Sequence, residues 1–155
     1  MVRYITYSGG EYLNIRTAVV TDYPELRNIY LESRRARFHW TNPEHMSLQD
    51  FDADTVDEHI IVAEQEDGQI LGFASLYLPD HFIHLLFIHP GFMGGGTGSR
   101  LLDASISLMQ QPVRLKCVSD NHKAIGFYER QGWKKVIEEG KPGEKYWVME
   151  YDTRA

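Results

Sequence analysis

A run rich in glycine, residues 94–98, stands between a strongly apolar segment and a segment with helical periodicity, and this arrangement constrains the fold most. The preceding residues 81–88 contain too few polar positions for a half-exposed strand, so we expect a strand buried on both faces in the centre of a sheet. After the turn, apolar or small side chains recur at the spacing of one helix face: Gly98, Leu101, Leu102, Ser105, Leu108 and Met109.

A strand, a glycine turn and a helix in this order present free backbone N–H groups to an anion at the positive end of the helix. The alternative is a plain flexible connection, because glycines are common in turns. Two phosphate-binding sequences do not match. A P-loop closes with Lys followed by Ser or Thr, and Ser99-Arg100 does not supply that pair. A dinucleotide-binding turn needs a third glycine where this chain has Ser99 or Leu101. Such a turn also follows the first strand of its fold, near the chain start, whereas the turn at residues 94–98 comes late in this chain.

The remaining sequence alternates short strand and helix patterns. We expect strands at residues 14–19, 59–64, 70–78, 81–88, 113–118, 133–138 and 146–151. Helices are expected after Thr21 or Asp22, near residues 47–50, from Gly98, and from Asn121 to a stop at Gly132. Asp67-Gly68 predicts a tight hairpin. The order indicates one domain of the mixed α/β class over residues 13–155, with residues 1–12 as an N-terminal arm.

Composition excludes several classes of protein. The chain has 155 residues, one cysteine and a net charge of −6, so no internal disulfide is expected and a reducing compartment, the cytoplasm, is favoured. No Lys/Arg cluster indicates a nucleic-acid partner, and no apolar run is long enough to cross a membrane. The first residues lack the pattern of a secretory signal.

A second sequence pattern, later in the chain, indicates which kind of site the glycine turn belongs to. Residues 121–133 read Asn-His-Lys-Ala-Ile-Gly-Phe-Tyr-Glu-Arg-Gln-Gly-Trp, and residues 86–102 contain the apolar strand, His89-Pro90 and the glycines. Together, and in this order, the two segments resemble the signatures of the GNAT superfamily of N-acetyltransferases. The resemblance extends over residues 14–151. It implies the GNAT fold, a mixed and mostly antiparallel sheet with splayed central parallel strands and about four helices.

The resemblance also implies a site for acetyl-CoA. The central strand would pair its backbone with the pantetheine arm, and the turn would hold the pyrophosphate. The residues that match these positions are Leu86, Phe87, Ile88, Met93, Gly94, Gly95, Gly96, Thr97, Gly98, Ser99, Asn121 and Tyr128. Met93 departs from the family's Gln or Arg, which leaves the affinity for CoA open. Asn121 equally suits a helix N-cap.

Proton transfer needs further side chains. Tyr128 matches the family tyrosine that protonates the departing thiolate, although its helical spacing also permits a plain core role. His84 stands where many relatives have a Glu on the central strand, and an imidazole can accept a proton near neutral pH. His81 is the other candidate base, on the opposite strand face. A buried, hydrogen-bonded histidine is the alternative for His84.

Two other features are ambiguous. Cys117 lies in a strand pattern without a nucleophile's partner motif, so we interpret it as a small core residue. An aromatic and basic cluster follows the first helix and is either part of the acceptor pocket or a solvated helix end: Arg34, Arg35, Arg37, Phe38, His39 and Trp40.

We therefore predict an acetyl-CoA-dependent N-acetyltransferase that transfers acetyl to a primary amine of a small molecule or peptide by direct attack in a ternary complex. No metal is required. The alternative is a non-catalytic acyl-CoA-binding or protein-interaction domain with the same fold. The acceptor amine is not determined by the sequence, and a homodimer stays open.

Overall fold

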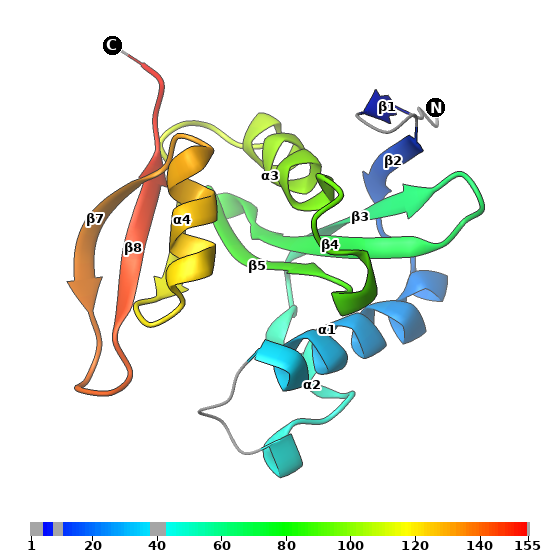
Figure 1. Ribbon diagram of the computed structural model, residues 1–155, viewed down its shortest axis with the longest axis horizontal. Helices are drawn as coiled ribbons and strands as arrows, with labels where there is room; N and C mark the ends of the chain where they lie inside the picture. The colour runs from blue at the N-terminus through cyan, green and yellow to red at the C-terminus, as the bar shows by residue number, and fades with distance from the viewer. Residues whose placement is uncertain (1–4, 8–10, 38–42, 155) are drawn as a thin grey trace.

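The computed structural model describes residues 5–7, 11–37 and 43–154 (Figure 1). Within them the chain forms eight strands: β1 Ile5–Tyr7, β2 Glu11–Thr17, β3 His59–Gln65, β4 Ile70–Tyr77, β5 Phe82–Ile88, β6 Val113–Val118, β7 Lys134–Glu139 and β8 Tyr146–Tyr151. The helices are α1 Tyr23–Arg37, α2 Asp50–Asp54, α3 Thr97–Ser107 and α4 His122–Arg130. Short 3-10 turns lie at Val20–Asp22, Pro43–His45, Leu78–Asp80 and Pro90–Phe92.

The strands of this described part form one sheet in the order β1-β2-β3-β4-β5-β6-β8-β7. The β5–β6 pair is parallel and the other neighbours are antiparallel. A parallel pair needs a crossover connection, and α3 supplies it between β5 and β6. The mixed α/β fold class is therefore confirmed.

The helices cover the two faces of the sheet (Figure 1). On one face Leu101 and Leu102 of α3 and Ile125 of α4 pack on the strands in a mainly aliphatic core. On the other, α1 presents Leu26 and Ile29. That second core is rich in rings packed edge to face or stacked: Tyr30, Phe51, Phe73 and Phe87.

Most strand predictions are confirmed, and β6 and β8 have the predicted bounds. The turn between β3 and β4 places Gly68 at φ 90°, a conformation that favours glycine and explains the Asp67-Gly68 signal. Ile5–Tyr7, within the predicted arm, pairs with β2 at the sheet edge, and the proposed boundary after residue 12 falls inside β2. No helix in the described ranges is long and apolar enough to cross a membrane.

The expectation that the central strand is buried on both faces is confirmed for Ile83, which belongs to the aliphatic core, and for Phe87, which belongs to the aromatic one, but it does not hold for the rest of the strand. In β5 only Ile83 and Phe87 are buried, whereas Leu85, Leu86 and Ile88 are half-buried and His84 is exposed. This partial exposure arises because the sheet opens along one edge of β5, in agreement with the splayed central strands that the family resemblance implies. That opening defines the candidate site.

Candidate functional site

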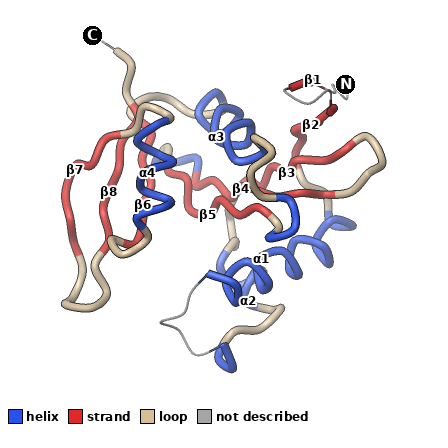
Figure 2. The backbone as a smooth tube through the Cα atoms, in the orientation of Figure 1, coloured by secondary structure: helices blue, strands red, loops and turns tan. Residues whose placement is uncertain are grey.

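The parallel strands β5 and β6 are paired only where both begin. Phe82 lies opposite Arg114 and Ile83 opposite Leu115, and the Arg114 N–H donates to the carbonyl of His81 at 3.1 Å. Beyond these two residue pairs the described strands share no further register. In Figure 2, β6 continues behind α4 whereas β5 runs toward the turn that leads into α3. The edge of β5 that faces β6 is thus left without a strand partner and can pair with an extended ligand.

A β-bulge marks the point where the strands part. Leu85 of β5 pairs with Ser75 of β4 and Ile83 pairs with Leu76, so His84 is the extra residue between them. A bulge bends its strand and increases the local twist, which turns the second half of β5 away from β6. At the far end of β5 the Ile88 carbonyl accepts a hydrogen bond from Ser33 of α1 at 3.2 Å.

The glycine turn follows this open strand and leads into α3. Gly94 and Gly96 have φ values of 86° and 84°, which L side chains rarely adopt. The first main-chain hydrogen bond of α3 runs from the Arg100 N–H to the Gly96 carbonyl, 3.2 Å, so the N–H groups of residues 97–99 have no acceptor within the helix. A Cβ built at Gly94 or Gly95 meets nothing within 4 Å. N–H groups without an acceptor in the helix, at the end of a turn with open space around Gly94 and Gly95, are suited to an anion.

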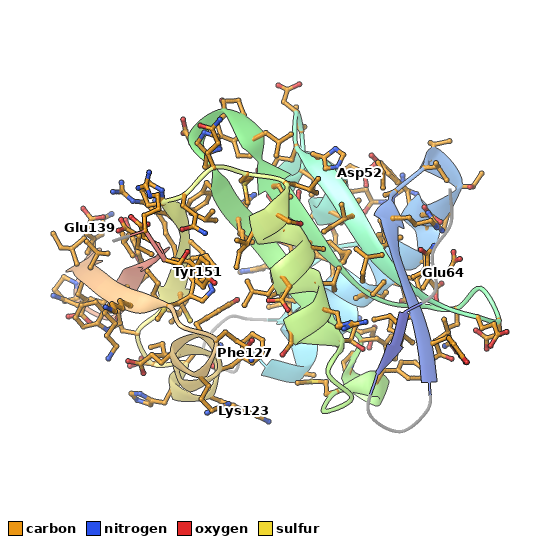
Figure 3. All side chains as sticks on the ribbon, turned by 90° about the horizontal axis from the view of Figure 1, so that it is seen from above. Asp52, Glu64, Lys123, Phe127, Glu139 and Tyr151 are labelled. Atoms are coloured by element: carbon orange, nitrogen blue, oxygen red, sulfur yellow. The ribbon has the colours of Figure 1, made fainter. Side chains whose placement is uncertain are left out.

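Three segments that are separate in sequence meet at Gly98. A Cβ at this position would lie 3.4 Å from the Phe127 ring of α4 and 3.9 Å from the Ile88 side chain of β5. Figure 3 labels Phe127 on α4 beside α3. The end of the open strand, the start of α3 and the middle of α4 therefore lie next to one another. The two sequence motifs form one region of the molecule.

Thr97 and Ser99 flank this contact point. Thr97 is 2 % exposed, and its Oγ1 is buried without a hydrogen-bond partner in the described residues. Ser99 is half-buried. Met93, before the glycines, is extended and 42 % exposed.

The second motif positions Asn121 and Tyr128 on α4. Asn121 is the N-cap, and its Oδ1 accepts the Ala124 N–H at 3.1 Å. The prediction that Asn121 suits a helix N-cap is therefore confirmed. Tyr128 is half-buried and packs edge to face on Phe127 and Trp133, with ring centroids 5.3 and 6.0 Å apart. Gly132 has φ 96° and ends the helix as predicted.

His84 has a partner that the sequence did not reveal. Its Nδ1 lies 3.0 Å from Oε1 and 2.8 Å from Oε2 of Glu58, the residue before β3. Glu58 also accepts a hydrogen bond from the buried Ser75 of β4. The Glu58 side chain is 9 % exposed and the His84 side chain 39 %. The alternative of a buried histidine is thus wrong, whereas hydrogen bonding is present.

His81 has a structural role. It adopts φ 51° at the end of a 3-10 turn, outside β5, and its Nδ1 accepts the Gln110 N–H at 3.2 Å. The prediction that His81 and His84 occupy opposite faces of one strand is wrong for this reason. Cys117 is buried in the aliphatic core, and burial raises the pKa of its thiol to about 11, which supports its interpretation as a core residue.

The aromatic and basic cluster is only partly described. Arg34 lies over the Tyr30 ring at 3.9 Å and pairs with Asp50 at 3.1 Å, so it links α1 to α2. Arg35 pairs with Glu32 at 3.7 Å. Phe38, His39 and Trp40, and the side chain of Arg37, lie outside the described residues.

Comparison with known proteins agrees with this geometry. The model of the acetyltransferase (GNAT) family matches residues 23–133. No curated protein matches the chain in sequence.

Solved structures with the same fold include acetyltransferases. Apo YjaB from Escherichia coli is 25 % identical, with a TM-score of 0.72 over 90 % of this chain and 97 % of that one. A GCN5-related N-acetyltransferase from Rhodopseudomonas palustris is 20 % identical, with a TM-score of 0.73 over 96 % and 97 %. The yncA protein from Salmonella typhimurium, solved with acetyl-CoA, is 20 % identical, with a TM-score of 0.65 over 92 % and 96 %. With a family model that spans most of its length, the chain belongs to the GNAT family of acetyltransferases.

Proposed function

We propose that this acetyltransferase moves the acetyl group of acetyl-CoA to a primary amine of a small molecule or peptide, by direct attack while both are bound. The observation that carries the proposal is the parting of β5 from β6 at His84, next to the glycine turn. It leaves an open strand edge and an exposed imidazole at the same point of the sheet.

The residues of the site fit acetyl-CoA. Its pyrophosphate carries negative charge, and the N–H groups of Thr97, Gly98 and Ser99 would hold it at the positive end of α3. Its pantetheine arm contains amides in an extended chain, and the open edge of β5 at Leu86, Phe87 and Ile88 would pair with them. Gly94 and Gly95 leave space for this approach, Gly96 continues the turn with φ 84°, and Met93 would contribute its backbone.

The chemistry then needs one proton acceptor and one donor. The amine nitrogen attacks the thioester carbonyl carbon, the new C–N bond forms, and the C–S bond breaks. His84 accepts the proton released by the amine, directly or through water. Tyr128 gives a proton to the leaving sulfur, and backbone N–H groups near residues 86–88 polarise the carbonyl. The products are the acetylated amine and free CoA.

Binding of acetyl-CoA is tested first, and turnover second. Calorimetry should detect acetyl-CoA binding to the full chain, and Gly98→Leu should weaken it, because a Cβ there would already lie 3.4 Å from the Phe127 ring and the further atoms of leucine need additional space. Release of free thiol is then measured with amines, polyamines, amino acids, aminoglycosides and peptides. Absence of acetyl-CoA binding to the unchanged chain contradicts the proposal. Binding without turnover on any amine supports the non-catalytic alternative.

Tyr128→Phe tests the acid role. Removal of the phenol oxygen should lower kcat by roughly 10²-fold or more, the range of general acid catalysis, with little change in acetyl-CoA affinity. The ring and its contacts with Phe127 and Trp133 are retained, so a fold defect is not expected. Unchanged kcat would remove Tyr128 from the mechanism.

A further inference from the structure

The largely buried Glu58 and the exposed His84 form a pair across strand β4, which lies between β3 and β5. Glu58 stands just before β3, Ser75 lies on β4, and His84 is the bulge residue of β5. Ser75 faces Ile60 of β3 and Leu85 of β5, which brings the three side chains together across neighbouring strands. Because the Glu58 side chain is almost entirely buried, its carboxylate needs hydrogen-bond donors, and Ser75 and His84 provide them.

The local backbone fixes Glu58 in this position. The Glu58 N–H donates to the Thr55 carbonyl at 3.1 Å, and Asp57 turns the chain with φ 63°. Glu58 is therefore held at the start of β3, directed at the bulge. The His84 Nδ1 lies within hydrogen-bond distance of both carboxylate oxygens of Glu58.

The chemistry of the pair determines where the proton sits on the imidazole. An ionised carboxylate only accepts hydrogen bonds, so Nδ1 must carry a hydrogen to bond with it. In a neutral imidazole the other nitrogen, Nε2, then holds the free lone pair. No hydrogen-bond partner of Nε2 occurs among the described residues, and the ring is partly exposed. Nε2 is thus the atom available to a protonated or attacking amine.

We propose that Glu58 is a positioning residue that holds His84 in the Nδ1–H tautomer, so that Nε2 accepts the proton of the acceptor amine. The proposal rests on the role of His84 in the proposed function. The carboxylate also stabilises the imidazolium that forms when Nε2 takes the proton. In the catalytic triad of a serine protease, replacement of the aspartate by asparagine keeps the geometry but lowers kcat by about 10⁴-fold, because the histidine then takes the wrong tautomer.

The tautomer is measured directly, without any acceptor. The full chain is labelled with ¹⁵N-histidine, and long-range ¹H–¹⁵N correlation spectra are recorded where the imidazole is neutral, with His84→Gln to assign the signal. The unchanged chain should show a protonated Nδ1 and an unprotonated Nε2 at His84. Glu58→Gln should lose this single form, because an amide can donate to Nδ1 as well as accept. The same tautomer in both proteins overturns the proposal.

Kinetics test the consequence for the reaction. Glu58→Gln should lower kcat by roughly 10²-fold, with the acetyl-CoA affinity within about twofold of the parent. In the His84→Gln background the same change should have almost no further effect, since Glu58 acts through His84. An equal loss in both backgrounds, or no loss in either, contradicts the positioning role. Glu58→Asp, with a shorter carboxylate, should recover part of kcat.

A neighbouring carboxylate supplies the control. Asp57→Asn removes one negative charge beside Glu58, and Asn tolerates the left-handed backbone at φ 63°. It should leave kcat and the His84 tautomer unchanged. Thermal unfolding of every variant separates a fold defect from a catalytic one. Absence of turnover on any amine by the unchanged chain would refute the proposed function, whereas the NMR spectra would still decide whether Glu58 fixes the tautomer.

Discussion

Gly94 and Gly95 are adjacent glycines with the same free surroundings and different backbone conformations. A Cβ at either position meets nothing within 4 Å, but only Gly94 of the two has a left-handed φ, 86°. Gly94→Ala should therefore lower the free energy of unfolding by about 1 kcal/mol, the cost of a left-handed L residue. Gly95→Ala should leave it unchanged or raise it by up to about 1 kcal/mol, because alanine restricts the unfolded chain.

Urea unfolding of the two variants without CoA makes this comparison. Both variants carry the same added methyl group, so steric effects cancel and the backbone term remains. Equal stability would mean that the turn relaxes around Gly94 and does not require its left-handed conformation. The left-handed conformation of Gly94 then would not be a fixed feature of the turn.

Two residues of the site region depend on contacts that a sequence does not display. Glu58 is 26 positions from His84, and no motif joins them. Gly72 of β4 lies where a Cβ would come within 2.6 Å of the Phe87 carbonyl oxygen, so glycine allows the end of β5 to approach β4 closely. Both roles arise only after β3, β4 and β5 are assembled, and local pattern could not predict them.

At the scale of elements, Asn121 caps the start of α4 and also has a proposed contact with CoA. Loss of its cap in Asn121→Ala should lower the free energy of unfolding by about 1 kcal/mol. Asn121→Ser keeps an oxygen that can accept the Ala124 N–H, so it should retain most of the stability. If the amide also contacts CoA, both variants should lose acetyl-CoA affinity.

The pair of variants separates the two roles of Asn121. Stability is measured by thermal unfolding and affinity by calorimetry. Serine with parental stability and parental affinity would assign Asn121 to capping alone. A stable serine variant with weakened binding would support the CoA contact proposed from the family resemblance.

The accuracy of the element predictions follows from how local each signal is. In β6 the buried Val113, Leu115 and Cys117 alternate with exposed residues, and the strand has the predicted bounds. Asp67-Gly68 predicted its hairpin because turn chemistry is local. The burial of β5 could not be predicted in the same way. An apolar run reports what a strand contains, whereas its exposure depends on whether β6 stays beside it.

For the whole molecule, Arg16 connects segments that are far apart in the chain. From β2 it pairs with Asp22 at 2.8 Å and with Glu64 of β3 at 2.6 Å. Asp22 is 8 % exposed and also accepts the Val19 N–H at 2.8 Å. The hydrogen bond from Arg16, and then that from Val19, lower the pKa of Asp22 below the ordinary value of an aspartate, despite the opposing effect of burial.

This network predicts how stability responds to acid. The folded-state pKa of Asp22 lies below the unfolded value, so over that range the unfolded chain binds more protons. The contribution of Asp22 is therefore fully present above about pH 4 and is lost as pH falls through its folded pKa. Arg154 lowers the pKa of the exposed Asp152 to about 2, and it should act in the same direction, but salt should screen it.

Urea unfolding near neutral pH and near pH 3, at low and high salt, tests this expectation. The unchanged chain should lose stability at the lower pH, and most of the Asp22 part should persist in high salt because the carboxylate is buried. Asp22→Asn should be less stable near neutral pH and should show a smaller difference between the two pH values. Asp152→Asn is the exposed control and should keep the parental difference in high salt. If Asp22→Asn also keeps the full parental difference, the loss of stability in acid arises from other groups and not from the Arg16–Asp22 pair.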